Sequence, residues 1–225
     1  MNENDDSPIE INPQETPQAS IIWLHGLGAD GYDFEPVAQM LQQQLQHPTR
    51  FVLPHAPIRP VTLNGGEQMR AWYDMLDLDH PRNVDWDTVY AGEAMLAELI
   101  NQERETHAPN TRLYLAGFSQ GGALALRLGL MRKFPFCGII ALSTYLLQNE
   151  GETFPVDKNN KLPLFMAHGN EDPIIPFNLA EATRNSMKQY GLEPEWHEYD
   201  MMHSVCPEEV EALAQWLNHQ TPESH

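Results

Sequence analysis

The chain has 225 residues, 41% of them hydrophobic, which is enough for one well-buried α/β domain. Its 32 acidic and 13 basic residues give a formal net charge of −19, and a surface of that sign repels nucleic acid and anionic membranes. We therefore expect no nucleic-acid partner.

The chain shows no membrane, secretion or metal signal. No apolar run approaches the roughly 20 residues of a membrane span, and the acidic first ten residues do not resemble a signal peptide. We predict a cytoplasmic protein without stable membrane insertion. Its two cysteines are too few for a disulfide scaffold, and no CxxC or HExxH occurs, so we expect no dedicated metal site.

Strand-like apolar runs alternate with helical patterns from one end of the chain to the other. Strands are expected over 9–11, 20–25, 50–54, 112–117, 138–143, 163–169 and, more polar and near an edge, 195–199. Helices are expected over 33–46, 84–102, 178–190 and 207–219, with a buried one after residue 122. This alternation predicts a mostly parallel sheet covered on both faces. We expect a single domain over 1–225, with frayed tails at 1–8 and 221–225.

The segment 54–83 interrupts this alternation. It holds four prolines and no clear period, yet it is too apolar for disorder. Two interpretations stay open, a packed surface loop or a wall of a substrate groove.

"GFSQG", residues 117–121, fits the G-x-S-x-G nucleophile elbow between a predicted strand and a predicted helix. Glycines on both sides let the turn lift the Ser119 hydroxyl clear of the sheet. The helix that follows directs its N–H groups and positive dipole end at the same place. The alternative is that Ser119 merely sits in a tight turn.

A serine hydroxyl needs a base and a group that orients the base. Asp172 follows the predicted strand 163–169 and is preferred over Glu171, because it is shorter and braced by neighbouring prolines. His203 follows the last predicted strand, whereas His197 lies within it. The chain order Ser119, Asp172, His203 is the one that this elbow requires, although Asp172 could simply begin a turn.

The stretch "HGLGADG", residues 25–31, offers the second half of an oxyanion hole. We expect the N–H of Gln120 and an N–H of this loop, that of Leu27, to bind the oxyanion, while His25 braces the loop. The same glycines also fit a dinucleotide fingerprint. Three nearby acids would repel a pyrophosphate, and the next strand lacks the acid that binds ribose, so we do not expect nucleotide binding.

Five blocks together resemble the carboxylesterase and acyl-protein thioesterase family of α/β-hydrolases: "HGLGADG", "MRAWYD", "GFSQGGALAL", "HGNEDPIIP" and the final histidine. The resemblance covers residues 20–217 and is nearer to the bacterial carboxylesterase branch. It implies an α/β-hydrolase fold, the triad above, and Leu27 and Gln120 as oxyanion donors. It places Trp72 near the acyl pocket, with Gly26 and Gly28 lining the substrate site, and it implies a homodimer. The short segment 143–163 predicts no large cap and an open, shallow site.

The sequence thus predicts a serine esterase for short to medium acyl chains that needs no cofactor. The first alternative is a thioesterase or lysophospholipase that removes long acyl chains from proteins or lipids. A peptidase is disfavoured because no gating domain is present, and a dienelactone-type hydrolase because the elbow holds serine rather than cysteine. An inactive binding protein with the same fold is the distant alternative.

Overall fold

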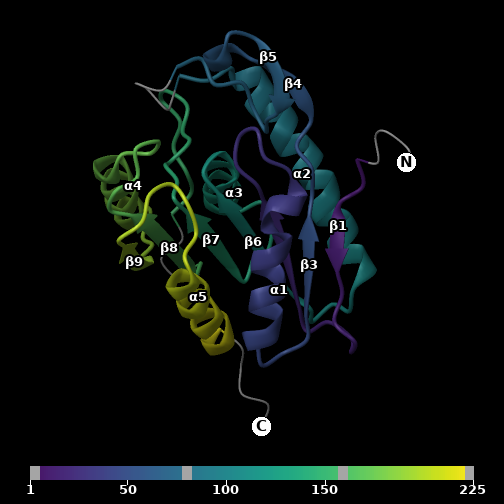
Figure 1. The fold of residues 1–225 in the computed structure, drawn as a ribbon. Coiled ribbons are helices and arrows are strands. Elements are labelled where there is room, and N and C mark those ends of the chain that lie inside the picture. Colours follow the sequence, from purple (N-terminus) through teal and green to yellow (C-terminus); the bar gives the residue numbers. More distant parts are fainter. Residues whose placement is uncertain (1–5, 78–82, 157–161, 221–225) are drawn as a thin grey trace.

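A seven-stranded sheet forms the centre of the protein (Figure 1). The structure is a computed structural model that describes residues 6–77, 83–156 and 162–220. The sheet order is β1-β3-β2-β6-β7-β8-β9, and every neighbouring pair is parallel except β1 with β3. The strands are β1 Ile9–Ile11, β2 Ala19–Leu24, β3 Thr49–Leu53, β6 Arg112–Phe118, β7 Gly138–Leu142, β8 Leu164–Gly169 and β9 Glu195–Tyr199. The mostly parallel sheet and the edge position of 195–199 are confirmed.

Helices cover both faces of the sheet, as the continuous apolar strands require. They are α1 Glu35–Gln44, α2 Trp86–Thr106, α3 Gln120–Leu130, α4 Phe177–Gln189 and α5 Pro207–His219, with a 3₁₀ turn η1 Gly31–Phe34 before α1. In Figure 1, α1 and α5 lie on the near face and α2 behind the sheet. Strand β2 is buried on both sides. Ile21 and Trp23 join the core under α1 and α5, whereas Ile22 and Leu24 join the core with α2 and α3.

The long segment after β3 contains a hairpin that the sequence did not predict. Strands β4 Ile58–Val61 and β5 Glu67–Arg70 pair antiparallel around a short 3₁₀ turn η2 Thr62–Asn64. Pro60 lies within β4, which is tolerated because this two-stranded ribbon leaves each strand an unpaired edge. The remainder of the predicted loop includes 78–82, which lie outside the described residues.

The strand ends bring the candidate residues to one edge. The loops after β2, β6, β8 and β9 all leave the carboxyl ends of parallel strands, which is where open α/β sheets carry their sites. Between β7 and β8, the described residues 143–156 and 162–163 form no helix, in agreement with the absence of a large cap.

Of the predicted tails, 1–5 and 221–225 lie outside the described residues, and Asp6 is held by Arg70 at 3.0 Å. No helix in the described ranges combines the length and apolarity that a membrane crossing demands.

Candidate active site

Ser119 occupies a strained turn between β6 and α3. Its backbone has φ 54° and ψ −118°, a conformation that L-residues rarely adopt. The turn is held because the Ser119 N–H donates to Leu142 O at 2.9 Å and the Thr144 hydroxyl donates to Ser119 O at 2.6 Å. A Cβ on Gly121 would lie 2.4 Å from Leu24 O, so only glycine lets α3 approach β2 this closely. This is the geometry of a nucleophile elbow.

Asp172 and His203 form a hydrogen-bonded pair beside this turn. Asp172 Oδ2 lies 2.7 Å from His203 Nδ1, and Oδ1 accepts the N–H groups of Ile174 and Ile175 at 2.8 and 2.9 Å. The Asp172 side chain is fully buried, whereas that of His203 is 17% exposed. The carboxylate therefore fixes the imidazole so that Nδ1 carries a proton and Nε2 is available as a base.

The loops that carry this pair pack directly on each other. The N–H groups of Asn170 and Glu171 donate to Tyr199 O and Met201 O at 2.8 and 3.2 Å. A Cβ on Gly169 would lie 2.2 Å from Met201 O, so glycine is needed at this contact. The Glu171 side chain is exposed and does not bind His203, which leaves Asp172 as the partner.

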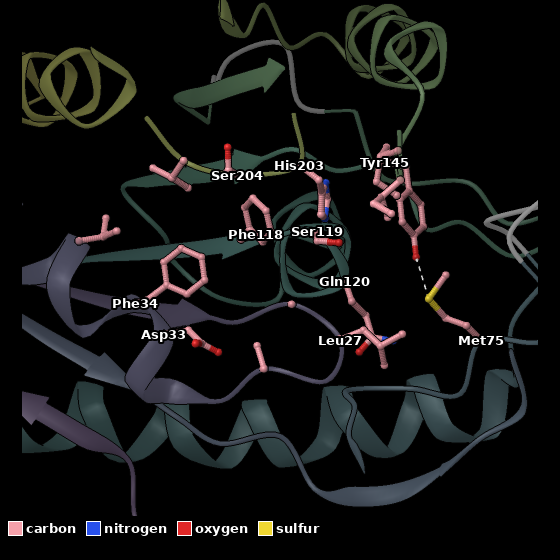
Figure 2. Close-up of a pocket in the computed structure, with 16 residues that line it drawn as sticks. Leu27, Asp33, Phe34, Met75, Phe118, Ser119, Gln120, Tyr145, His203 and Ser204 are labelled. Atoms are coloured by element: carbon pink, nitrogen blue, oxygen red, sulfur yellow. Dashed lines mark hydrogen bonds between the residues drawn. The ribbon is translucent and has the colours of Figure 1, made fainter. Parts of the chain in front are cut away.

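His203 and Ser119 meet in the same cavity, where Figure 2 shows the imidazole next to the serine hydroxyl. The imidazole packs on Phe118, with ring centroids 4.6 Å apart. Among the described residues no hydrogen bond joins Ser119 Oγ to His203. Such bonds are often long before substrate binds.

The loop after β2 is braced by His25, as expected. The Ala56 N–H donates to His25 Nε2 at 2.9 Å, so Nδ1 carries the proton and donates to Gly26 O at 2.7 Å. Burial lowers the pKa of His25 to about 4, which keeps the imidazole neutral at physiological pH. In the described part of the chain, no hydrogen bond uses the N–H of Leu27 or Gln120. Both groups remain available for an oxyanion.

Trp72 lies elsewhere than the resemblance implied. It is fully buried behind the loop after β2, where its indole N–H donates to His25 O at 2.8 Å, and it does not line the cavity. The Gln120 side chain accepts the Trp72 N–H at 2.8 Å and donates to Tyr73 O at 2.9 Å. Trp72 therefore supports the elbow and the candidate oxyanion hole instead of contacting an acyl chain.

The cavity has a volume of about 570 Å³ and a mostly apolar lining. Gly26 lines it, as expected of a substrate-site residue, and Leu27, the predicted oxyanion donor, lines it too. Gly28 lies outside the lining and donates its N–H to Arg70 O. Ser119 lines this cavity and is 8% exposed. The open, shallow site expected from the short segment 143–163 stays a prediction. The wall residues Phe34, Val37, Met75, Phe118, Tyr145, Ile174, Ile175 and Val205 account for most of the apolar lining.

Several residues that line the cavity or support the Asp172–His203 pair had no distinct signal in the sequence. Tyr145 and Met75 close one end of the cavity, and the Tyr145 hydroxyl points at Met75 Sδ over 4.0 Å (Figure 2). His168 is buried beside the pair, with Nε2 2.8 Å from Ile175 O and 3.5 Å from Asp172 Oδ2. Burial lowers the pKa of His168. Its position directly before Gly169, at the end of a predicted strand, is the one hint that the sequence offers.

The titratable groups of the site do not form a metal-binding cluster. Within the described ranges, no three histidine, cysteine, aspartate or glutamate side chains gather closely enough to hold a metal ion.

Comparison with known proteins gives a consistent family. The phospholipase/carboxylesterase family profile matches residues 6–221. Acyl-protein thioesterase 1 of Neurospora crassa is 38% identical over 225 residues, covering 96% of this chain and 92% of the relative. Acyl-protein thioesterase 1 of Mycosarcoma maydis is 37% identical, covering 95% and 97%.

Solved structures of similar proteins share the fold of this chain. Maize acyl-protein thioesterase 2 superimposes with a TM-score of 0.79 at 27% identity, covering 95% of this chain and 98% of that one. A Bacillus cereus carboxylesterase reaches 0.78 at 17% identity, covering 95% and 94%, and shows the fold alone. The named relatives are fungal thioesterases, so placement in the bacterial branch stays a prediction. The chain belongs to the phospholipase/carboxylesterase family of hydrolytic enzymes with the α/β-hydrolase fold.

Proposed function

We propose that this hydrolase cleaves carboxylic esters of short to medium acyl chains through an acyl-enzyme on Ser119. The observation that carries the proposal is the 2.7 Å bond from Asp172 to His203 in a cavity that also holds the elbow serine. His203 Nε2 takes the Ser119 proton as Oγ attacks the substrate carbonyl carbon. Asp172 holds the imidazole and stabilises the imidazolium that forms.

The N–H groups of Leu27 and Gln120 are the proposed donors to the oxyanion. One such donor is typically worth about 10²- to 10³-fold in rate. When the tetrahedral intermediate collapses, His203 returns the proton to the leaving alcohol. Water then attacks the acyl-enzyme with His203 as base, and the carboxylic acid leaves as Ser119 recovers its proton.

A thioesterase or lysophospholipase acting on long acyl chains is the second candidate. It is favoured by the relatives named acyl-protein thioesterase 1 and by the apolar cavity of about 570 Å³. Thioesters and oxygen esters use the same nucleophile, base and oxyanion donors, so chain length and leaving group separate the two candidates. The cytoplasmic location and the homodimer expected from the sequence stay predictions.

The test is hydrolysis of p-nitrophenyl esters from acetate to palmitate by the wild type and Ser119→Ala. The proposal expects highest kcat/KM for short to medium chains and loss of nearly all activity in the variant. A kcat/KM that is highest for the palmitate ester would favour the thioesterase or lysophospholipase instead. Ser119→Ala with full activity would refute the mechanism. A wild type that neither turns over esters nor reacts with a fluorophosphonate would indicate the inactive scaffold.

A further inference from the structure

We propose that the Asp33 carboxylate selects the leaving group of the substrate, favouring esters or thioesters whose leaving group carries a cationic nitrogen. This inference rests on the proposed function, since it requires Ser119 to attack a carbonyl in this cavity. Asp33 would act as a specificity-determining residue and would take no part in the bond changes.

Asp33 reaches the cavity from η1, the turn that follows the loop of Leu27. Its Oδ2 accepts the Asp30 N–H at 3.0 Å, which fixes the carboxylate in the cavity wall. Figure 2 shows Asp33 next to Phe34, across Ser119 from the end that Tyr145 and Met75 close. The lining thus extends in two arms to either side of the nucleophile, and Asp33 is the one carboxylate among the described lining residues.

The chemistry of the two arms assigns the two halves of an ester. The arm toward Tyr145 and Met75 also holds Leu27 and suits a hydrocarbon chain (Figure 2). An acyl chain packed on Asp33 would desolvate a charge, which is costly. Both arms are largely apolar, since Phe34 lines the arm of Asp33, and the Asp33 charge is what distinguishes them. We therefore place the acyl group in the arm toward Tyr145 and Met75, and the leaving group in the arm of Asp33. Ser204, which directly follows the base that protonates the leaving group, also lines the cavity.

Within the part of the chain that the structure describes, no cationic partner of the Asp33 charge is found. No lysine or arginine of residues 6–77, 83–156 and 162–220 lines the cavity, and no ion pair in these ranges involves Asp33. A cationic leaving group would supply the missing partner, while a phosphate or carboxylate would be repelled. Because Asp33 is exposed to solvent, water screens the attraction. Exposed ion pairs of this kind correspond to a rate preference of about two- to fivefold.

The test compares butyrylcholine with its neutral isostere, 3,3-dimethylbutyl butyrate. The ratio of their kcat/KM values cancels any effect of a variant on the bond changes common to both esters. Asp33→Asn removes the charge but keeps an oxygen for the Asp30 N–H. At low ionic strength we expect this variant to lower the choline-to-neutral ratio about two- to fivefold. Asp33→Ser, whose hydroxyl can also accept that bond, serves as a second charge-free variant.

Asp30→Asn is the matched control. It removes the same charge three residues away, outside the cavity lining, and its amide oxygen can still accept the Tyr32 N–H. We expect its ratio to stay close to that of the wild type. An unchanged ratio in both Asp33 variants, with both esters still hydrolysed, would overturn the inference and leave the proposed function intact. Wild-type failure on both esters, or activity surviving in Ser119→Ala, would overturn the proposed function instead.

Discussion

Replacing Asp172 by asparagine should inactivate the enzyme while leaving the fold intact. The reason lies in the two N–H groups of Ile174 and Ile175, which point at Oδ1 from 2.8 and 2.9 Å. They require an acceptor, so the amide oxygen of Asn must face them and its NH₂ must face His203. That NH₂ donates to Nδ1, and the ring proton moves to Nε2, where it blocks removal of the Ser119 proton.

The size of the loss follows from the cost of the opposite amide orientation. Turning the NH₂ toward Ile174 and Ile175 leaves one part-buried and one buried N–H donor without this acceptor, at about 1–3 kcal/mol each. The productive tautomer is then disfavoured by about 2–6 kcal/mol, and a tenfold effect corresponds to about 1.4 kcal/mol. We therefore expect kcat/KM to fall about 30- to 2 × 10⁴-fold.

The assay is p-nitrophenyl butyrate hydrolysis together with the rate of fluorophosphonate labelling, since both depend on activation of Ser119. Nitrogen-15 spectra of the imidazole should show the proton on Nε2 of His203. Thermal unfolding should change little, because the acceptor for both N–H groups remains. Glu171→Gln, at the exposed neighbour, is the control and should match the wild type. Asp172→Asn activity within tenfold of the wild type would refute the reasoning.

Two further predictions concern buried groups. Gln120→Glu keeps the acceptor for the Trp72 N–H but places a carboxylate oxygen next to Tyr73 O, where the Gln120 amide donates a hydrogen bond. We expect urea unfolding to show that the free energy of unfolding falls by about 2–3 kcal/mol. Unchanged stability would argue against a stabilising role for these two hydrogen bonds. Burial raises the pKa of Glu209 from 4.5 to about 8. The stability that this group contributes is therefore present at low pH and is lost as the pH rises from about 4.5 to 8, by on the order of 5 kcal/mol. Glu209→Gln should lose less stability than the wild type over that interval, and identical pH profiles in urea unfolding would contradict the assignment.

The sheet and the acid–base pair were predictable because their signals are local. Strand β2 is apolar on both faces, and a helix follows each of the strands β6, β8 and β9. This alternation of strands and helices along the chain indicates a parallel sheet. The elbow pattern then restricts the partners of Ser119 to residues after later strands. Asp172 and His203 followed from this order, and the structure brings them within hydrogen-bond distance.

The walls of the cavity were not predictable in the same way. The segment after β3 has no period, and the hairpin β4–β5 includes Pro60, which argues against a strand in a sequence. An aromatic residue in such a segment can face a ligand or the core. For Trp72 the partner of its indole N–H decided the outcome, and that partner is the carbonyl of His25, 47 positions away in the chain. Asp33 is similar, because a pattern of glycines gives no indication of which acid lines a cavity.

The edge position of β9 links catalysis to one border of the sheet. This strand is paired on one side only, to β8, and the loop that follows it carries His203. The elbow, by contrast, lies on β6, which is flanked by β2 and β7. Opening of the β9 border would separate base from nucleophile while most of the core persists. Catalytic competence therefore depends on the integrity of this border as well as on that of the core.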